Sequence, residues 1–89
     1  MITNNVTVFS VKATYTNPAT KTTIPAILVG NMFEKIHETI GVVERSYTLH
    51  THFPSLNKTS EPLYFDRLNE LYSALESFQR AERDLQATK

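Results

Sequence analysis

The sequence predicts a small α+β domain, a two-layer sandwich with the element order β-β-α-β-α. Three observations support this prediction. Segments rich in β-branched and aromatic residues alternate apolar with polar side chains, which is typical of half-buried strands. Two further segments repeat apolar residues every three or four positions, which is typical of amphipathic helices. The chain has 89 residues, so we expect residues 1–89 to form a single domain around a small core.

The first two predicted strands, residues 6–15 and 22–29, form a hairpin. Asn17 and Pro18 stand between them, and proline presets the backbone angle that a tight turn needs. Pro25 has no backbone N–H, so we expect the second strand at an edge of the sheet or with a bulge at this position. Alternation places one apolar set on a common face of the first strand: Phe9, Val11, Ala13 and Tyr15.

Residues 31–40 are predicted to form the first helix. Asn31 is a suitable N-cap, Glu34 stands three residues later as in a capping box, and Gly41 suits the left-handed position after a helix. The apolar stripe consists of Met32, Phe33, Ile36 and Ile40. A right-handed crossover through this helix would bring a third strand, residues 42–53, beside the first. The result is a three-stranded sheet of order 2-1-3 with both helices on one face.

The third predicted strand separates two kinds of side chain. Tyr47 and Leu49 share the core face, whereas His50 and His52 share the other face. Two histidines spaced in this way form half of a zinc site, but zinc needs a third ligand, and Glu44 is six residues away. We therefore predict no metal and no cofactor. A metal-binding protein or metal-dependent hydrolase centred on these histidines is kept as an alternative.

The last predicted helix runs from residue 63 to 87, with Ser60 as its cap. About 25 residues span about 37 Å, which is long beside a domain with a radius of gyration of about 12 Å. Residues 79–89 are thus a helical tail, either solvated with a weak Glu76–Arg80 pair or in contact with a partner. The predicted partner-binding residues of the helix are Leu71, Leu75, Phe78, Arg80, Glu82 and Leu85.

Composition excludes several classes of function. Nine basic and nine acidic residues cancel, which argues against binding to nucleic acid or to an anionic membrane. The chain has no cysteine, and no segment approaches the run of about 18 apolar residues of a membrane span. Its first residues do not resemble a signal peptide, so a cytoplasmic location is expected. No phosphate-binding loop and no catalytic constellation is present, so we predict that it is not an enzyme.

The leading hypothesis is a small protein-binding module, an inhibitor or accessory factor that binds another protein or forms a homodimer. Such proteins are frequent in phages and mobile elements. This expectation rests only on the small size of the chain and on its lack of a recognisable motif. Besides the last helix, the open face of the sheet is the predicted contact surface, because sheet faces and edges are common docking sites. Its predicted residues are Lys12, Thr14, Glu44, Thr48, His50 and His52. A weak nucleic-acid binder that uses this face is the remaining alternative.

Overall fold

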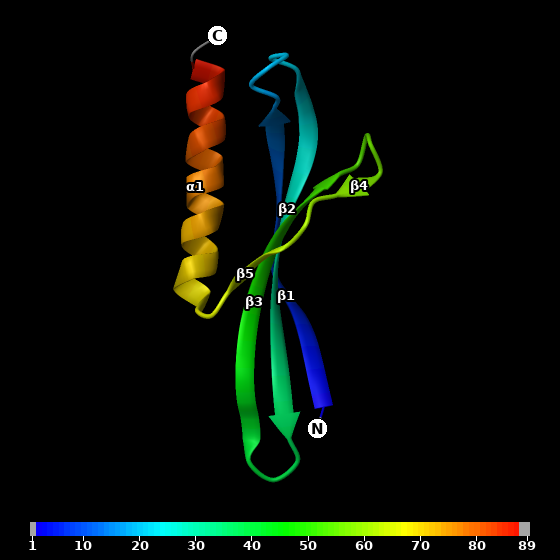
Figure 1. Cartoon of the computed structure of the whole chain (residues 1–89), viewed down its shortest axis with the longest axis vertical. Helices are drawn as coiled ribbons and strands as arrows, with labels where there is room; N and C mark the ends of the chain where they lie inside the picture. Colours follow the sequence, from blue (N-terminus) through cyan, green and yellow to red (C-terminus); the bar gives the residue numbers. More distant parts are fainter. Residues whose placement is uncertain (1, 88–89) are drawn as a thin grey trace.

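The computed structural model describes residues 2–87 as one antiparallel sheet with a helix packed against it (Figure 1). The elements are β1 (Ile2–Thr16), β2 (Thr23–His37), β3 (Gly41–Phe53), β4 (Lys58–Thr59), β5 (Leu63–Phe65) and α1 (Leu68–Ala87). β1, β2 and β3 form a meander with β2 in the centre, and the two short strands pair with the outer edge of β3. Residues 88 and 89, the end of the predicted tail, lie outside the described residues.

The predicted fold class is wrong in three respects. The sheet has the order β1-β2-β3-β4 with β5 also on β3, it is not three-stranded with the order 2-1-3, and the described residues contain one helix where two were expected. The expected helix at residues 31–40 is the second half of β2 and the turn that follows. Apolar residues in this short segment fit both periods, and pairing on both sides selects the strand: Met32 lies opposite Val6 of β1 and Tyr47 of β3.

Gly41 does take the left-handed conformation, with a φ of 88°, but it closes the β2–β3 turn and does not follow a helix. The β1–β2 hairpin is confirmed, and Asn17 organises its turn. The Asn17 side chain accepts a hydrogen bond from the Ala19 N–H at 2.9 Å, and the Asn17 N–H donates to the Thr22 carbonyl at 2.9 Å.

Pro25 lies in the central strand, contrary to the predicted edge position. It is tolerated because β3 pairs with β2 only as far as Ile27, so no strand faces Pro25 on that side. On the other side Pro25 lies opposite Thr14, at a place in the ladder where the backbone groups point away from β1. The proline therefore removes no ladder hydrogen bond.

The last helix begins five residues later than predicted. Leu63–Phe65 pairs with Leu49–Tyr47 along the outer edge of β3 and forms β5. Ser60 is not a helix cap, because its hydroxyl accepts a hydrogen bond from the Thr51 N–H at 2.9 Å. Edge pairing therefore takes the residues that an apolar pattern alone assigns to the first turns of the helix.

The core is small and lies between α1 and the upper half of the sheet. Leu28, Tyr47, Leu49 and Leu71 form its buried cluster. The predicted core side of Tyr47 and Leu49 is thus confirmed. The residues packed around this cluster are Val8, Phe9, Ala13, Met32, Phe65, Ala74, Leu75 and Phe78. Strict alternation would place Val8 on the face opposite Phe9, but a β-bulge between Thr7 and Phe9 turns Val8 towards the core.

The helix covers only half of the sheet (Figure 1), so the molecule is elongated. Its extents are 56 × 26 × 17 Å, and its radius of gyration is 15.7 Å, against about 12 Å for a compact domain of this length. The uncovered part consists of residues 2–7 of β1, 31–37 of β2 and 41–46 of β3, and is called the projecting half below.

Gly30 allows an aromatic ring to lie on the central strand. It is opposite Phe9, whose ring approaches within 2.5 Å of the place that a Cβ atom would take at residue 30. The same ring contacts Tyr72 of α1, with 5.6 Å between ring centroids. Gly30 thus lets Phe9 connect β1, β2 and the helix.

We predict that Gly30→Ala lowers the free energy of unfolding by about 1–3 kcal/mol, because the added methyl group displaces the Phe9 ring from a packed position. Urea denaturation followed by circular dichroism measures this change. In a Phe9→Ala background the methyl group meets no ring, so the loss caused by Gly30→Ala should largely disappear. An equal loss in both backgrounds would show that the ring is not the cause.

Candidate functional site

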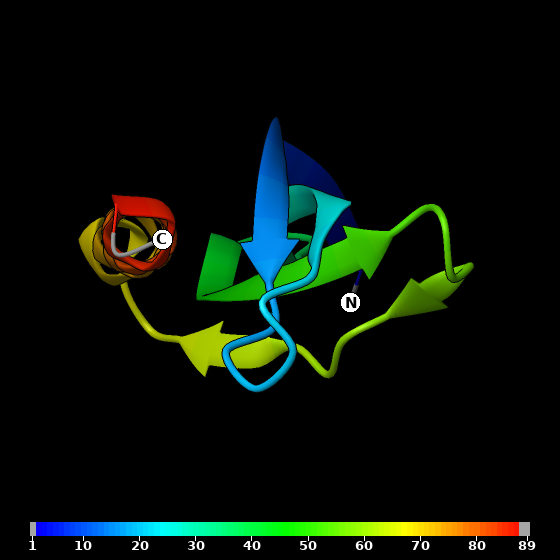
Figure 2. The same cartoon turned by 90° about the horizontal axis from the view of Figure 1, so that it is seen from above.

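The face of β1, β2 and β3 that is turned away from α1 is the first candidate surface, and it is called the open face. Figure 2 shows the helix along one side of the sheet only. The cross-strand register places the open-face residues in rows. From β1, β2 and β3 in turn these rows are Lys12, Ile27 and His52; Ser10, Val29 and His50; Thr7, Asn31 and Thr48; Asn5, Phe33 and Ser46; and Thr3, Lys35 and Glu44.

The centre of the open face is apolar and its flanks are polar. Ile27, Val29 and Phe33 project from the central strand and are half-buried by their neighbours, although the helix does not cover them. On β3, His52 lies opposite Ile27 and His50 lies opposite Val29. An apolar centre with a polar rim is the arrangement found in protein interfaces.

The structure places three of the six predicted open-face residues in two adjacent rows. His50 and His52 lie on β3, and Lys12 lies in the row of His52, on the other side of Ile27. Thr48 lies on this face but is only 5% exposed. Glu44 lies at the far end, where it forms a surface ion pair with Lys35 at 3.3 Å. The predicted surface is therefore concentrated around the two histidines.

Thr14 departs from this group. Its hydroxyl accepts a hydrogen bond from Gln86 at 2.8 Å and is 3.3 Å from the carboxylate of Glu82, because α1 runs beside the edge of β1 there. Thr14 therefore links β1 to the helix, and its hydroxyl group already has partners within the chain.

The metal alternative gains no third ligand from the fold. Within residues 2–87, no group of three or more His, Cys, Asp or Glu side chains is placed to hold a metal ion. His50 and His52 lie opposite Val29 and Ile27, and a ring nitrogen of His52 is 3.1 Å from the Thr59 hydroxyl.

The predicted partner-binding residues of α1 mostly face the sheet. Leu71 is completely buried, and Leu75 and Phe78 pack against the core cluster. Glu82 is also buried, and Leu85 is half-buried. Arg80 alone of the six is exposed, and it pairs with Glu76 at 3.1 Å, as predicted. Contact of the helix with a partner stays a prediction, and the structure uses most of these side chains within the chain.

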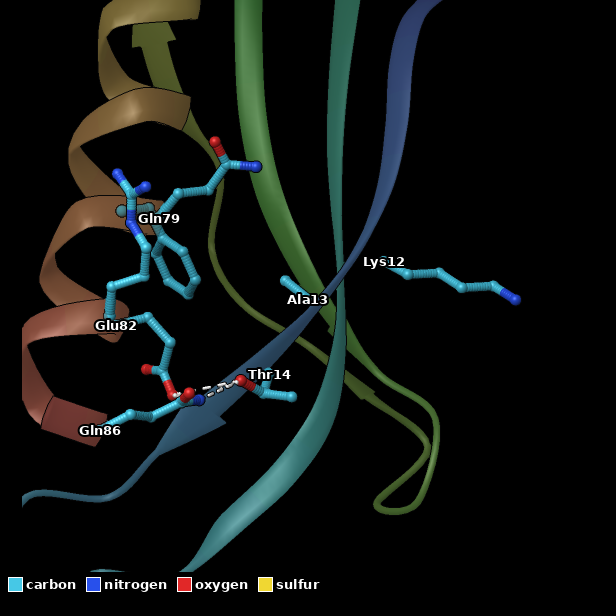
Figure 3. Close-up of a pocket in the computed structure, with 8 residues that line it drawn as sticks. Lys12, Ala13, Thr14, Gln79, Glu82 and Gln86 are labelled. Carbon is cyan, nitrogen blue, oxygen red and sulfur yellow. Dashed lines mark hydrogen bonds between the residues drawn. The ribbon is translucent and has the colours of Figure 1, made fainter. Parts of the chain in front are cut away.

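Sequence reasoning missed the structural role of Glu82. It lines an open groove of about 380 Å³ between β1 and the second half of α1 (Figure 3). Its carboxylate accepts hydrogen bonds from the Thr16 N–H at 3.1 Å, from the Thr16 hydroxyl and from Gln86 at 3.3 Å. The available signal was its position: Glu82 interrupts the apolar stripe of the helix, on the side that faces the sheet.

The carboxylate of Glu82 takes the place of a strand carbonyl at the end of β1. Burial raises the pKa of Glu82, but the hydrogen bonds from Thr16, Gln86 and Thr14 stabilise the charged form and together hold the pKa below its ordinary value. Because an ionised acceptor forms stronger hydrogen bonds than a neutral one, Glu82 fixes the end of α1 to the edge of β1.

A second carboxylate stabilises the projecting half. Glu34 of β2 forms an ion pair with Arg45 of β3 at 2.8 Å and accepts a hydrogen bond from Asn4 of β1 at 3.4 Å. The hydrogen bond from Arg45 lowers the pKa of Glu34, despite its partial burial. This cross-strand group holds the three strands together where no helix covers them.

Comparison of the chain with protein-family models, with curated proteins and with solved structures gives no significant match. Within the described residues, no helix has the length and apolar character needed to cross a bilayer.

We predict that Glu82→Gln lowers the free energy of unfolding at pH 7 by about 1–2 kcal/mol, because it replaces charge-assisted hydrogen bonds with neutral ones. The folded-state pKa is lowered, so the contribution of the charge is present above the ordinary glutamate pKa of about 4.3. It is lost as the pH falls through the lower folded-state pKa. The difference between wild type and variant should therefore shrink in this acidic range.

Urea denaturation at neutral and acidic pH measures this difference. The matched control is Glu76→Gln, which removes an exposed carboxylate from the same helix and should change stability far less. A loss that stays constant over the whole pH range would contradict the assigned role of the Glu82 charge.

Proposed function

We propose that the protein is a small, non-enzymatic protein-binding module that contacts its partner through the open face. One observation carries this proposal: Ile27, Val29 and Phe33 form an apolar stripe on the central strand, on the face that α1 leaves uncovered. A sheet face that only meets water is normally polar, with apolar side chains on the helix side. The open face differs, because it has apolar side chains on β2, the central strand between β1 and β3.

The flanks of the stripe support binding to a protein. His50 and His52 border it on β3, while Ser10 and Lys12 border it on β1. This rim supplies hydrogen-bond donors and acceptors around an apolar centre, as in protein interfaces of moderate size. The net charge of zero suits a protein partner better than a polyanion.

The mode of action that we propose is occupation of a surface of the partner, as an inhibitor or accessory factor would do. Binding of this kind needs a rigid, prearranged surface and no reacting group. The stripe lies on the strand that is paired along both edges, where the backbone is held most firmly.

Site-specific photo-crosslinking in the native host cells tests this function. Benzoylphenylalanine at His50, beside the apolar stripe, should give a crosslink to a second protein, and Val29→Lys should remove that crosslink. Thermal unfolding of each variant checks that the fold is retained.

The matched control carries the same crosslinker at Ser77, an exposed residue of α1. Ser77 should give no specific product. Crosslinks at Ser77 with none at His50 would place the contact on the helix and would contradict the open face as the binding surface.

A further inference from the structure

The edge of β1 in the projecting half is a strand edge without a neighbour. Within residues 2–87, β1 pairs with β2 alone. Above the bulge, α1 runs beside the edge, with Tyr72 against Phe9 and Glu82 on the Thr16 N–H. Below the bulge, residues 2–7 have neither a strand nor the helix beside them (Figure 1).

The ladder fixes which backbone groups point outwards along this edge. The Thr16 N–H points away from β2, since it donates to Glu82 of the helix. In an antiparallel pair, residues alternate between pointing to the neighbour and pointing away. The extra residue at the bulge shifts this alternation by one, so Thr3, Asn5 and Thr7 present their N–H and carbonyl groups outwards.

The chemistry of this edge differs from that of the other uncovered edge. Proteins protect a free strand edge with charged residues, proline or a bulge. On β3, residues 41–46 include Glu44 and Arg45 and contain a register shift. On β1, residues 2–7 contain neither a charged residue nor a proline. The edge of β3 is therefore protected against pairing, and this part of β1 is not.

We propose that two copies of this chain pair through residues 3–7 of β1, antiparallel, about a two-fold axis at Asn5. This register places Asn5 opposite Asn5 of the second copy and Thr3 opposite Thr7, so that all the outward backbone groups meet in hydrogen-bonded pairs. Threonine pairs across strands are favourable, and this register places Thr3 of each copy opposite Thr7 of the other. A strand without charge meets itself without like-charge repulsion.

The exposed area is larger than that of a compact protein. The chain exposes 6212 Å², whereas a compact monomer of this size exposes about 5,300 Å². The excess reflects the elongated shape, in which the projecting half has no helix against it. Ile2 and Val6, which are 61% and 41% exposed, lie on the strand that would gain a neighbour. Closed two-fold pairs are also the commonest homo-oligomers.

Light scattering coupled to size exclusion, run over a range of concentrations, should show a dimer. Asn5→Lys places two like charges opposite each other at the axis and should raise the dissociation constant roughly tenfold or more. Ser10→Lys is the matched control, because it adds the same charge to β1 outside the paired segment and should leave the dimer intact. A mixture of Asn5→Lys and Asn5→Asp chains should restore dimers.

Single cysteines test the register directly, because the chain has no cysteine of its own. Opposed Cα atoms in a hydrogen-bonded pair are about 5.5 Å apart, a distance that a disulfide spans. Asn5→Cys should therefore form a disulfide-linked dimer under mild oxidation much faster than Ser10→Cys.

A strict monomer would overturn the proposal, as would a dimer that is unaffected by Asn5→Lys and crosslinks equally well through both cysteines. The pairing uses a different surface from the apolar stripe of the open face. If it fails, crosslinking from His50 to another protein still tests the proposed function on its own.

Discussion

The pairing of β2 along both of its edges is the interaction on which the rest of the structure depends. Residues 23–36 of β2 lie in the ladder with β1, and residues 27–37 also face β3. Because of this pairing, residues 31–37 form a strand and the sheet extends beyond the helix. The same pairing determines which side chains lie on each face of the sheet. It also brings Gly30 under the Phe9 ring, where only a residue without a side chain fits.

A small core makes the polar connections more important than their number suggests. The buried apolar cluster contains four residues, and just one of them, Leu71, comes from the helix. Hydrophobic packing therefore fixes the first half of α1, while Glu82 fixes the second half to the end of β1 through Thr16. The two ends of β1 differ as a result: one is protected by a helix that supplies an acceptor, and the other has its outward backbone groups free.

The sequence correctly predicts features that depend on the local alternation of side chains. Its predictions are wrong where pairing with distant strands determines the secondary structure. Alternation places Tyr47 and Leu49 correctly in the core and His50 and His52 opposite them, because a strand with one buried face has little freedom of phase. The segment 31–40 fits a helix equally well by its apolar spacing, and only partners on β1 and β3 decide for a strand.

The candidate surfaces show the same division. The polar rim of the open face follows from alternation along β1 and β3, whereas its apolar centre depends on the phase of β2. Ile27 and Val29 lie in the predicted second strand, but Phe33 lies in the segment that was wrongly assigned to a helix. Glu82 appears in the sequence as an interruption of an apolar stripe. Its role becomes visible only when residue 16, far away in the chain, is placed beside it. A carboxylate on the buried side of a helix is thus a signal that hydrogen-bond donors lie opposite, since an unpaired buried carboxylate is too costly to retain.

The two proposed surfaces are connected by the geometry of the ladder. In the projecting half, the residues of β1 whose backbone points outwards are the same ones whose side chains lie on the open face, namely Thr3, Asn5 and Thr7. When a second copy pairs with this edge about an axis normal to the sheet, the open faces of the two copies lie on the same side and form one continuous surface. Two apolar stripes would then lie on one side of one continuous sheet, and a partner with a repeated or symmetric surface would meet both at once. The gain in affinity from such double contact needs no additional side chain, because the second contact becomes intramolecular once the first has formed.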